Sequence, residues 1–408
     1  MKNQIKTAIM VMIIAVIALA GCGGSKSNNS SSATSFAYFS ATDGEHGYEL
    51  WKTDGTDVGT VMVKDINITG DSYPCGFTVF NSALYFNAND GTHGRELWKT
   101  DGTDAGTVMV KDINITGNSY PGGFIVFNGA LYFQANDGAL GVELWKTDGT
   151  EAGTVMVKDI NITGDSYPGG FTVFNGELFF SANDGTHGYE LWKTDGTDAG
   201  TVMLKDINIT GDSHVGGFSV FNGALFFSAY DETNGYELWK TDGTETGTVM
   251  LKDIASGGFT ILDDTLYFVA DDGENGSELW KTDGNEAGTV MVKDINITGS
   301  SSPNGFTVFN SALYFHADDG THGIELWKTD GTDAGTVMLK DINITGVSNP
   351  YRFTVFNSAV YFIANDGSHG GELWKTDGTD AGTVMVKDIN PGTGTSIYLM
   401  TSIVVFTH

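Results

Sequence analysis

The stretch FTVFNGELFF at residues 171–180 is followed by ELWKTDG at residues 190–196 and by TVMLKDI at residues 201–207. The first stretch places two β-branched and aromatic runs around Asn175-Gly176, which is the strongest short signal for a β-hairpin. Two further strand-like runs follow, and each is preceded by a loop rich in Asp and Gly. This part of the chain therefore predicts four consecutive antiparallel strands.

The pairing of the third and fourth strands can be predicted from the six-residue loop between them. Folding the chain about residues 195–200 places Glu190 opposite Lys205 and Trp192 opposite Met203. Cross-strand pairs of this kind contribute roughly 0.2–1 kcal/mol each, so they help to fix the register of the strands. We therefore expect the Glu-Leu-Trp-Lys segment to be structural.

The four-strand unit recurs along the chain. Eight tryptophans mark the copies at intervals of 47 residues, with one interval of 41 between Trp239 and Trp280. The shortened copy loses residues only between its fourth strand and the next first strand, at residues 253–259. A period of this length predicts a propeller or a solenoid. The tryptophans are Trp51, Trp98, Trp145, Trp192, Trp239, Trp280, Trp327 and Trp374.

The two ends of the repeat region complement each other. Residues 36–39 align with second strands such as residues 83–86, whereas residues 403–406 align with first strands such as residues 124–127. The C-terminal strand is therefore expected to complete the first blade and close a ring. An open solenoid would need distinct capping repeats. The fold predicted for residues 36–408 is an all-β, eight-bladed β-propeller of four-stranded antiparallel blades.

The recurring motif Glu-Leu-Trp-Lys-Thr-Asp-Gly resembles the ELWxxDGT repeat family of exported and surface proteins of bacteria. The resemblance covers residues 36–408 and recurs in all eight copies. It implies a propeller-like fold and an exported setting. It brings no established reaction and no catalytic residues.

The N-terminus is typical of an export signal. Lys2 and Lys6 precede an apolar run over residues 7–20, and Leu19-Ala20-Gly21-Cys22 resembles the lipobox of bacterial lipoproteins. This resemblance implies removal of residues 1–21, lipidation of Cys22 and a flexible Ser/Asn-rich tether over residues 22–35. Gly23 in place of Asp implies the outer membrane and leaves open which side of it the protein faces. We expect membrane contact through the lipid anchor only.

The formal net charge of −30 excludes nucleic acid as an expected partner, because a polyanion would be repelled. We predict no cofactor. Excess carboxylate leaves calcium as an alternative, with Asp184, Asp195 and Asp198 as candidate ligands. Neither Asp-Gly loop follows the alternating acidic pattern that wraps calcium.

Function is harder to predict, because nearly every polar residue recurs around the ring. Departures from the repeat, such as Arg95, His214, His316 and Arg352, are interpreted as scattered substitutions. The sequence thus predicts a non-catalytic, membrane-anchored and monomeric binding or scaffolding module that recognises an envelope protein or polysaccharide multivalently. The alternatives are a propeller hydrolase or lyase and an envelope-assembly scaffold. An asymmetric, charged central pocket would favour the enzyme.

The longer loops are expected to share one face of the propeller, where recognition usually occurs. The histidines among them are interpreted as metal ligands or as turn residues before glycine. The candidate ligand-face residues are His46, His93, His187, His322, His369, Tyr167, Tyr189, Asn208 and Asp212.

Overall fold

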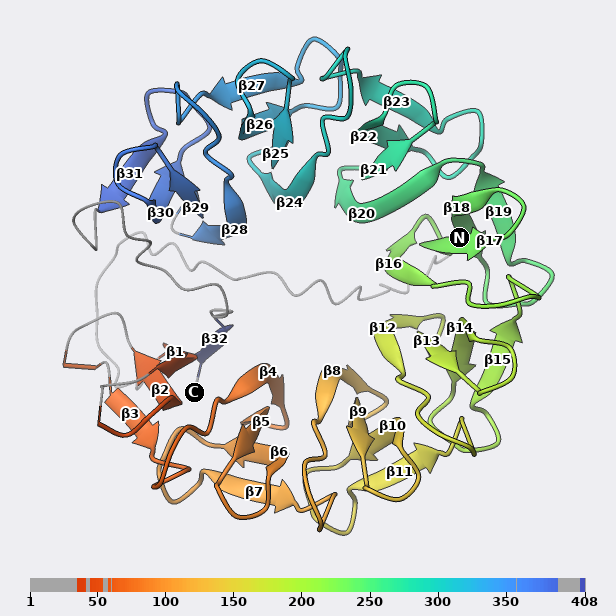
Figure 1. Cartoon of the computed structure of the whole chain (residues 1–408), viewed down its shortest axis with the longest axis vertical. Helices are drawn as coiled ribbons and strands as arrows, with labels where there is room; N and C mark the ends of the chain where they lie inside the picture. The colour runs from red at the N-terminus through yellow and green to blue at the C-terminus, as the bar shows by residue number, and fades with distance from the viewer. Residues whose placement is uncertain are drawn as a thin grey trace, which may run out of the picture.

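The computed structural model describes residues 35–41, 45–53, 58–59, 61–356, 358–387 and 404–407. These residues form eight four-stranded antiparallel sheets, which we number 1 to 8 in chain order. The sheets are arranged around a ring in a propeller-like fashion (Figure 1). The described residues include no helix long and apolar enough to cross a membrane.

The first strand of each sheet lies nearest the centre of the ring (Figure 1), and first strands of neighbouring sheets contact one another from sheet 2 to sheet 8. In sheet 1 this place belongs to the C-terminal strand β32 (Val404–Thr407). The other first strands are β4 (Cys75–Phe80), β8 (Gly122–Phe127), β12 (Gly169–Phe174), β16 (Gly216–Phe221), β20 (Ala255–Leu262), β24 (Asn304–Phe309) and β28 (Tyr351–Phe356).

The second and third strands form the middle of each sheet. The second strands are β1 (Ser35–Ala41), β5 (Ala83–Asn89), β9 (Ala130–Asn136), β13 (Glu177–Asn183), β17 (Ala224–Asp231), β21 (Thr265–Asp271), β25 (Ala312–Asp318) and β29 (Ala359–Asn365). The third strands are β2 (Glu49–Thr53), β6 (Arg95–Thr100), β10 (Val142–Thr147), β14 (Tyr189–Thr194), β18 (Gly235–Thr241), β22 (Ser277–Thr282), β26 (Ile324–Thr329) and β30 (Gly371–Thr376).

The fourth strands are short and lie at the outside of the ring (Figure 1). They are β3 (Val61–Lys64), β7 (Val108–Lys111), β11 (Val155–Lys158), β15 (Val202–Lys205), β19 (Val249–Lys252), β23 (Val290–Lys293), β27 (Val337–Lys340) and β31 (Val384–Lys387). Only two residues separate β19 from β20, so the six-residue deletion falls in the connection between sheets, as predicted.

The tight turn predicted between first and second strands is present. Asn175 and Gly176 have φ angles of +49° and +80°, which are the left-handed values that a two-residue hairpin turn requires. The predicted pairing of the two chain ends is also present, since β1 and β32 are antiparallel with Phe36 opposite Phe406. Residues 1–34, including Cys22, lie outside the described residues.

The hydrophobic core is divided into layers between neighbouring sheets. One layer joins Phe179 and Leu191 of sheet 4 to Leu225, Phe227 and Trp239 of sheet 5. Equivalent layers join the other described neighbours from sheet 1 to sheet 8. Each sheet therefore depends on its neighbours to bury its two faces.

One predicted strand pair is wrong. Trp192 lies opposite Met203 as expected, but Leu191 and not Glu190 pairs with Lys205, because a β-bulge shifts the register between Leu191 and Trp192. Glu190 is instead fully buried and accepts hydrogen bonds from the backbone N–H groups of Ile207 and Ser213 at 2.8 and 3.1 Å. Its carboxylate thus holds the connection to the next sheet, and burial raises the pKa of Glu190 to about 7.

Candidate functional site

The connections from second to third strand and from fourth strand to the next sheet leave the ring on one side, which we call the loop face. Four predicted histidines on it pair through Nδ1 with the carboxylate of an aspartate three residues earlier, at 2.6–2.7 Å. The aspartate hydrogen bond raises the pKa of His93, His187 and His322. These pairs and the exposed His46 belong to separate sheets, so the five histidines are not brought together. The pairs are His93–Asp90, His187–Asp184, His322–Asp319 and His369–Asp366.

The remaining loop-face candidates divide into exposed and structural residues. Tyr167 is 49% exposed, and Tyr189 is partly buried. Asn208 is buried, and its Nδ2 donates a hydrogen bond to the backbone oxygen of Asp212 at 3.0 Å. The Asp212 carboxylate in turn accepts a hydrogen bond from the backbone N–H of Tyr189 at 2.8 Å. Asn208 and Asp212 therefore shape the loop.

The predicted calcium ligands accept hydrogen bonds from the protein itself. Asp184 accepts from the backbone N–H of His187, Asp195 accepts from the backbone N–H of Thr197, and Asp198 accepts from Nζ of Lys158 in the preceding sheet at 2.9 Å. Within the described residues, no group of three or more His, Cys, Asp or Glu side chains could hold a metal ion. Calcium binding stays a prediction.

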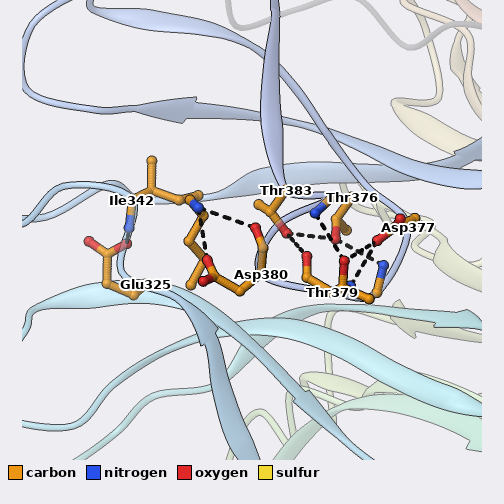
Figure 2. Close-up of polar contacts among 10 residues, drawn as sticks. Glu325, Ile342, Thr376, Asp377, Thr379, Asp380 and Thr383 are labelled. Carbon is orange, nitrogen blue, oxygen red and sulfur yellow. Dashed lines mark hydrogen bonds and ion pairs between the residues drawn. The ribbon is translucent and has the colours of Figure 1, made fainter.

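Figure 2 shows the Asp195-type turn in sheet 8. The carboxylate of Asp377 accepts hydrogen bonds from the backbone N–H and hydroxyl of Thr379 at 2.9 and 2.7 Å. The hydroxyls of Thr376 and Thr383 lie 2.7 Å apart across the turn, and Asp380 accepts from Nζ of Lys340 of sheet 7 at 2.8 Å (Figure 2). The Asp-Gly-Thr motif thus closes a turn and joins neighbouring sheets.

A depression of about 320 Å³ lies on the inner wall of the ring across the first strands of sheets 6, 7 and 8. Arg352 lies at its edge, exposed, with a φ angle of +58°. In the other first strands from β4 to β24 the equivalent residue is a glycine with φ between +66° and +76°. These glycines are Gly76, Gly123, Gly170, Gly217, Gly258 and Gly305.

The glycine position is crowded as well as left-handed. A Cβ atom added at Gly305 would lie 2.8 Å from the ring of Phe353 in the next sheet. Arg352 places a Cβ and a long cationic side chain at this position, in a conformation that L residues rarely adopt. Strained residues of this kind persist where the surrounding structure holds them, and they cluster at functional sites.

His316 lies one strand behind the depression and differs from its counterparts in the other sheets. Its Nδ1 lies 2.6 Å from the backbone oxygen of Pro350 in sheet 8. Because a carbonyl oxygen can only accept, Nδ1 carries the proton and Nε2 keeps its lone pair. Burial lowers the pKa of His316, which favours this neutral form.

Asn304 lies opposite His316 in the register of β24 and β25. Its Oδ1 accepts a hydrogen bond from the backbone N–H of Gly305 at 2.6 Å, which leaves the amide Nδ2 as a donor. Pro350, the partner of His316, is two residues from Arg352 in the chain. Asn304 and Arg352 line the depression, and the His316 ring lies opposite Asn304 in the register and contacts the backbone two residues before Arg352, at the loop-face end of the inner wall. We call Asn304, His316 and Arg352 the inner-wall site.

No family model and no curated protein matches the chain. Solved structures with similar folds include a puromycin hydrolase, at 13% identity over 79% of this chain and 54% of that chain with a TM-score of 0.45. A prolyl endopeptidase matches at 13% identity over 76% and 49% with a TM-score of 0.46. A puromycin-hydrolyzing peptidase of Mycobacterium tuberculosis matches at 9% identity over 78% and 53% with a TM-score of 0.45. The chain spans about half the length of these structures.

These structures are hydrolytic enzymes by name, and the comparison contradicts the prediction of a non-catalytic binding or scaffolding module. That prediction is wrong, and we do not retain it. It rested on the repetition of polar residues around the ring, whereas the inner-wall site is made of three residues that do not repeat. Identities of 9–13% assign no reaction to this chain.

Sequence reasoning missed the inner-wall site because it treated His316 and Arg352 as unrelated substitutions. They belong to different copies of the repeat, and only the packing of sheet 7 against sheet 8 brings them together. One signal was available, since aligning the copies shows Arg352 in a column of glycines. An arginine in a column of glycines indicates a position where the protein tolerates a strained backbone conformation.

Proposed function

We propose that this protein is a propeller enzyme, a hydrolase or a lyase, that acts on a substrate with one carboxylate held at the inner-wall site. The observation that carries the proposal is Arg352, which takes a left-handed φ of +58° at the edge of the depression where other sheets have glycine. This cation breaks the symmetry of the ring at one place, which is what a catalytic site needs and a repeated binding surface does not.

Each residue of the site has a role that follows from its chemistry. The Arg352 guanidinium can hold a carboxylate with two parallel hydrogen bonds. Nε2 of His316 accepts a proton. In a hydrolase the proton comes from a water whose oxygen attacks the substrate and displaces the leaving group, and in a lyase it comes from the carbon next to the carboxylate while a double bond forms and the bond to the leaving oxygen breaks. In both cases the leaving group takes the proton from Nε2. The Nδ2 group of Asn304 donates to the substrate oxygen that gains negative charge. The net charge of −30 would repel a polyanion, so a substrate with a single carboxylate fits better than an acidic polymer.

The proposal includes the closure and the cellular address of the protein. Pairing of β1 with β32 supports a closed eight-bladed propeller in which the C-terminal strand completes the first blade. The lipobox-like Leu19-Ala20-Gly21-Cys22 supports lipidation of Cys22 and anchoring of a monomer at the bacterial outer membrane. The repeat motif supports membership of the ELWxxDGT group of exported proteins.

The test uses His316→Asn in the mature protein. Asn87 occupies the equivalent position in sheet 2 and donates from Nδ2 to the backbone oxygen of Pro121 at 3.0 Å, so asparagine at 316 is expected to keep the contact with Pro350 and to lose only the base. Two substrate sets are supplied. N-blocked dipeptides with a free carboxylate report hydrolysis, and oligosaccharides that carry a single uronic acid report elimination through the ultraviolet absorbance of the new double bond.

We expect turnover in one of the two sets. His316→Asn is expected to lower kcat/KM by about 100-fold or more with an unchanged melting temperature. Arg352→Gln is expected to act mainly on KM. The matched control is His93→Asn, which removes an exposed histidine outside the site, at a position where sheets 5 and 6 have asparagine, and is expected to leave turnover unchanged. Absence of turnover in both sets, or full activity of His316→Asn, would overturn the proposal.

A further inference from the structure

The loop face of sheets 1 to 5 carries a series of aromatic side chains, which we call the aromatic arc. They lie at or next to the start of a third strand, in the next connection between sheets or, for Tyr230, near the end of a second strand, and Arg95 and Val142 interrupt the series. Five of its tyrosines are between 41% and 60% exposed. The members of the arc are Tyr48, Tyr73, Tyr120, Tyr167, Tyr189, His214, Tyr230 and Tyr236.

At each end of the arc, neighbouring rings contact one another. At one end, Tyr48 and Tyr73 are stacked with ring centroids 5.3 Å apart, and the Arg95 guanidinium lies 5.6 Å from the Tyr73 centroid. At the other end, the rings of His214 and Tyr236 are stacked at 6.3 Å. These contacts hold the rings in fixed orientations while their outer surfaces stay exposed.

Four of the aromatic residues have a left-handed backbone conformation, in which a bulky side chain is not expected. Tyr73, Tyr120, Tyr167 and His214 have φ angles between +43° and +46°. The equivalent residue between sheets 7 and 8 is Asn349, which has the same φ of +43° and tolerates it better than a bulky side chain does. Four successive connections therefore carry an aromatic residue where asparagine would fit with less strain, which indicates a use for the rings.

The aromatic arc covers only part of the circumference of the propeller and stops at sheet 5. In sheets 6 to 8 none of the equivalent described positions is aromatic, and they hold Ser277, Ser302, Ile324, Asn349 and Gly371. A purely structural role would be needed equally in every connection of full length, because these connections share the same backbone hydrogen bonds. For example, the backbone N–H of Tyr73 donates to the oxygen of Tyr48 and that of Asn349 donates to the oxygen of Ile324, at 3.0 and 3.1 Å.

The polar groups beside the rings indicate the class of ligand. The carboxylates of Asp71 and Asp165 raise the pKa of Tyr73 and Tyr167, so negative charge lies beside two of the exposed rings. A sugar ring presents C–H groups that stack on an aromatic face and hydroxyls that donate to carboxylates. The net charge of −30 disfavours an anionic chain, and it also disfavours nucleic acid as a stacking ligand.

We infer that the aromatic arc binds an uncharged oligosaccharide chain along the loop face of sheets 1 to 5. The inference extends the proposed function, because the arc shares the loop face with the inner-wall site, but it does not depend on the proposed reaction. Binding along the arc can be measured without turnover.

The test is titration calorimetry of the mature protein with cellohexaose and with chitohexaose. The variant is the double substitution Tyr120→Ala and Tyr167→Ala, which removes two exposed rings from the middle of the arc. The control is Ile162→Ala, since Ile162 is 82% exposed in the same connection as Tyr167 and lies outside the arc. We expect one of the two sugars to bind, the double variant to bind at least about tenfold more weakly, and the control to bind like the wild type.

Two further arms separate the alternatives. Arg352→Gln is expected to keep the sugar affinity, so that failure of the inner-wall site and failure of the arc can be told apart. A proline-rich decapeptide is titrated in parallel, because exposed tyrosines also bind such peptides. Binding of the peptide and neither sugar, binding of no ligand, or equal sugar affinity of the double variant and the wild type would each overturn the inference.

Discussion

The substitution Arg352→Gly tests whether the strain at the inner-wall site is present. It restores the residue found at this position in the other first strands from β4 to β24, and it removes the cation without touching the core. We expect the variant to fold more stably than the wild type and to lose binding of small carboxylates. A gain in stability with a loss of function is the behaviour of a residue kept for activity.

The magnitude follows from two opposing effects. A residue other than glycine in a sparsely populated backbone region costs about 1–3 kcal/mol, which the substitution recovers. Glycine increases the conformational freedom of the unfolded chain, which offsets about 0.5–1 kcal/mol of that gain. The free energy of unfolding is therefore expected to rise by about 1 kcal/mol, and Tm by about 1–2 °C in a protein of this size.

Differential scanning calorimetry and acetate titration check the two halves of this prediction. The matched control is Gly305→Arg, the reverse exchange at the same position of the neighbouring sheet. Its Cβ would lie 2.8 Å from the Phe353 ring at a φ of +76°, so we expect it to destabilise the protein by more than about 1 kcal/mol. A lower Tm for Arg352→Gly would refute the reasoning, since it would show that the contacts of the arginine outweigh its backbone strain.

Three further predictions concern the closure of the propeller, its buried glutamates and its membrane anchor. Removal of residues 402–408 deletes β32, leaves β1 without its inner partner and is expected to lower Tm markedly or cause aggregation, and an unchanged melting curve would contradict closure by the C-terminal strand. Burial raises the pKa of Glu96, Glu143 and Glu190 from 4.5 to about 7, so the folded protein binds protons that the unfolded chain releases between these values. The contribution of these three glutamates to the free energy of unfolding should therefore be greatest below about pH 4.5 and should fall as pH rises towards about 7. Melting curves at high salt, where surface repulsion is screened, check the direction, and Glu190→Gln should reduce the slope. Cys22→Ser is expected to release the protein from membranes into the aqueous phase of a detergent partition, and retention in the detergent phase would argue against the lipid anchor.

The local structure of each repeat could be predicted from the sequence because short-range rules fix it. Asn175-Gly176 predicted a hairpin turn, and the turn is present because both residues can adopt positive φ. Complementary strands at the two ends predicted that the C-terminal strand completes the first sheet, and β32 pairs with β1 there. The location of the deletion between β19 and β20 followed from the same alignment.

The register of the third and fourth strands and the burial of Glu190 could not be predicted from the sequence. Glu190 was predicted opposite Lys205, yet an extra residue in β15 places Lys205 opposite Leu191, and the Glu190 carboxylate is buried, where backbone N–H groups of the connection bind it. A one-residue shift reverses the face of a side chain, and no local pattern in the strand announces the bulge. Only the following connection, which folds back over the strand, makes a buried carboxylate stable there.

By itself, the sequence determined the repeat, the strands, the turns and the complementary chain ends, because these depend on neighbouring residues and on a pattern repeated eight times. The tertiary structure alone decided which of the non-repeating residues lie close together in space. His316 and Arg352 are in different copies, and the packing of sheet 7 against sheet 8 places the His316 ring on the Pro350 carbonyl beside Arg352. The aromatic arc likewise exists only because each connection crosses the loop face next to the start of a third strand. Repetition specifies each sheet locally, whereas a single site requires contacts between copies, and those contacts are set by the geometry of the ring.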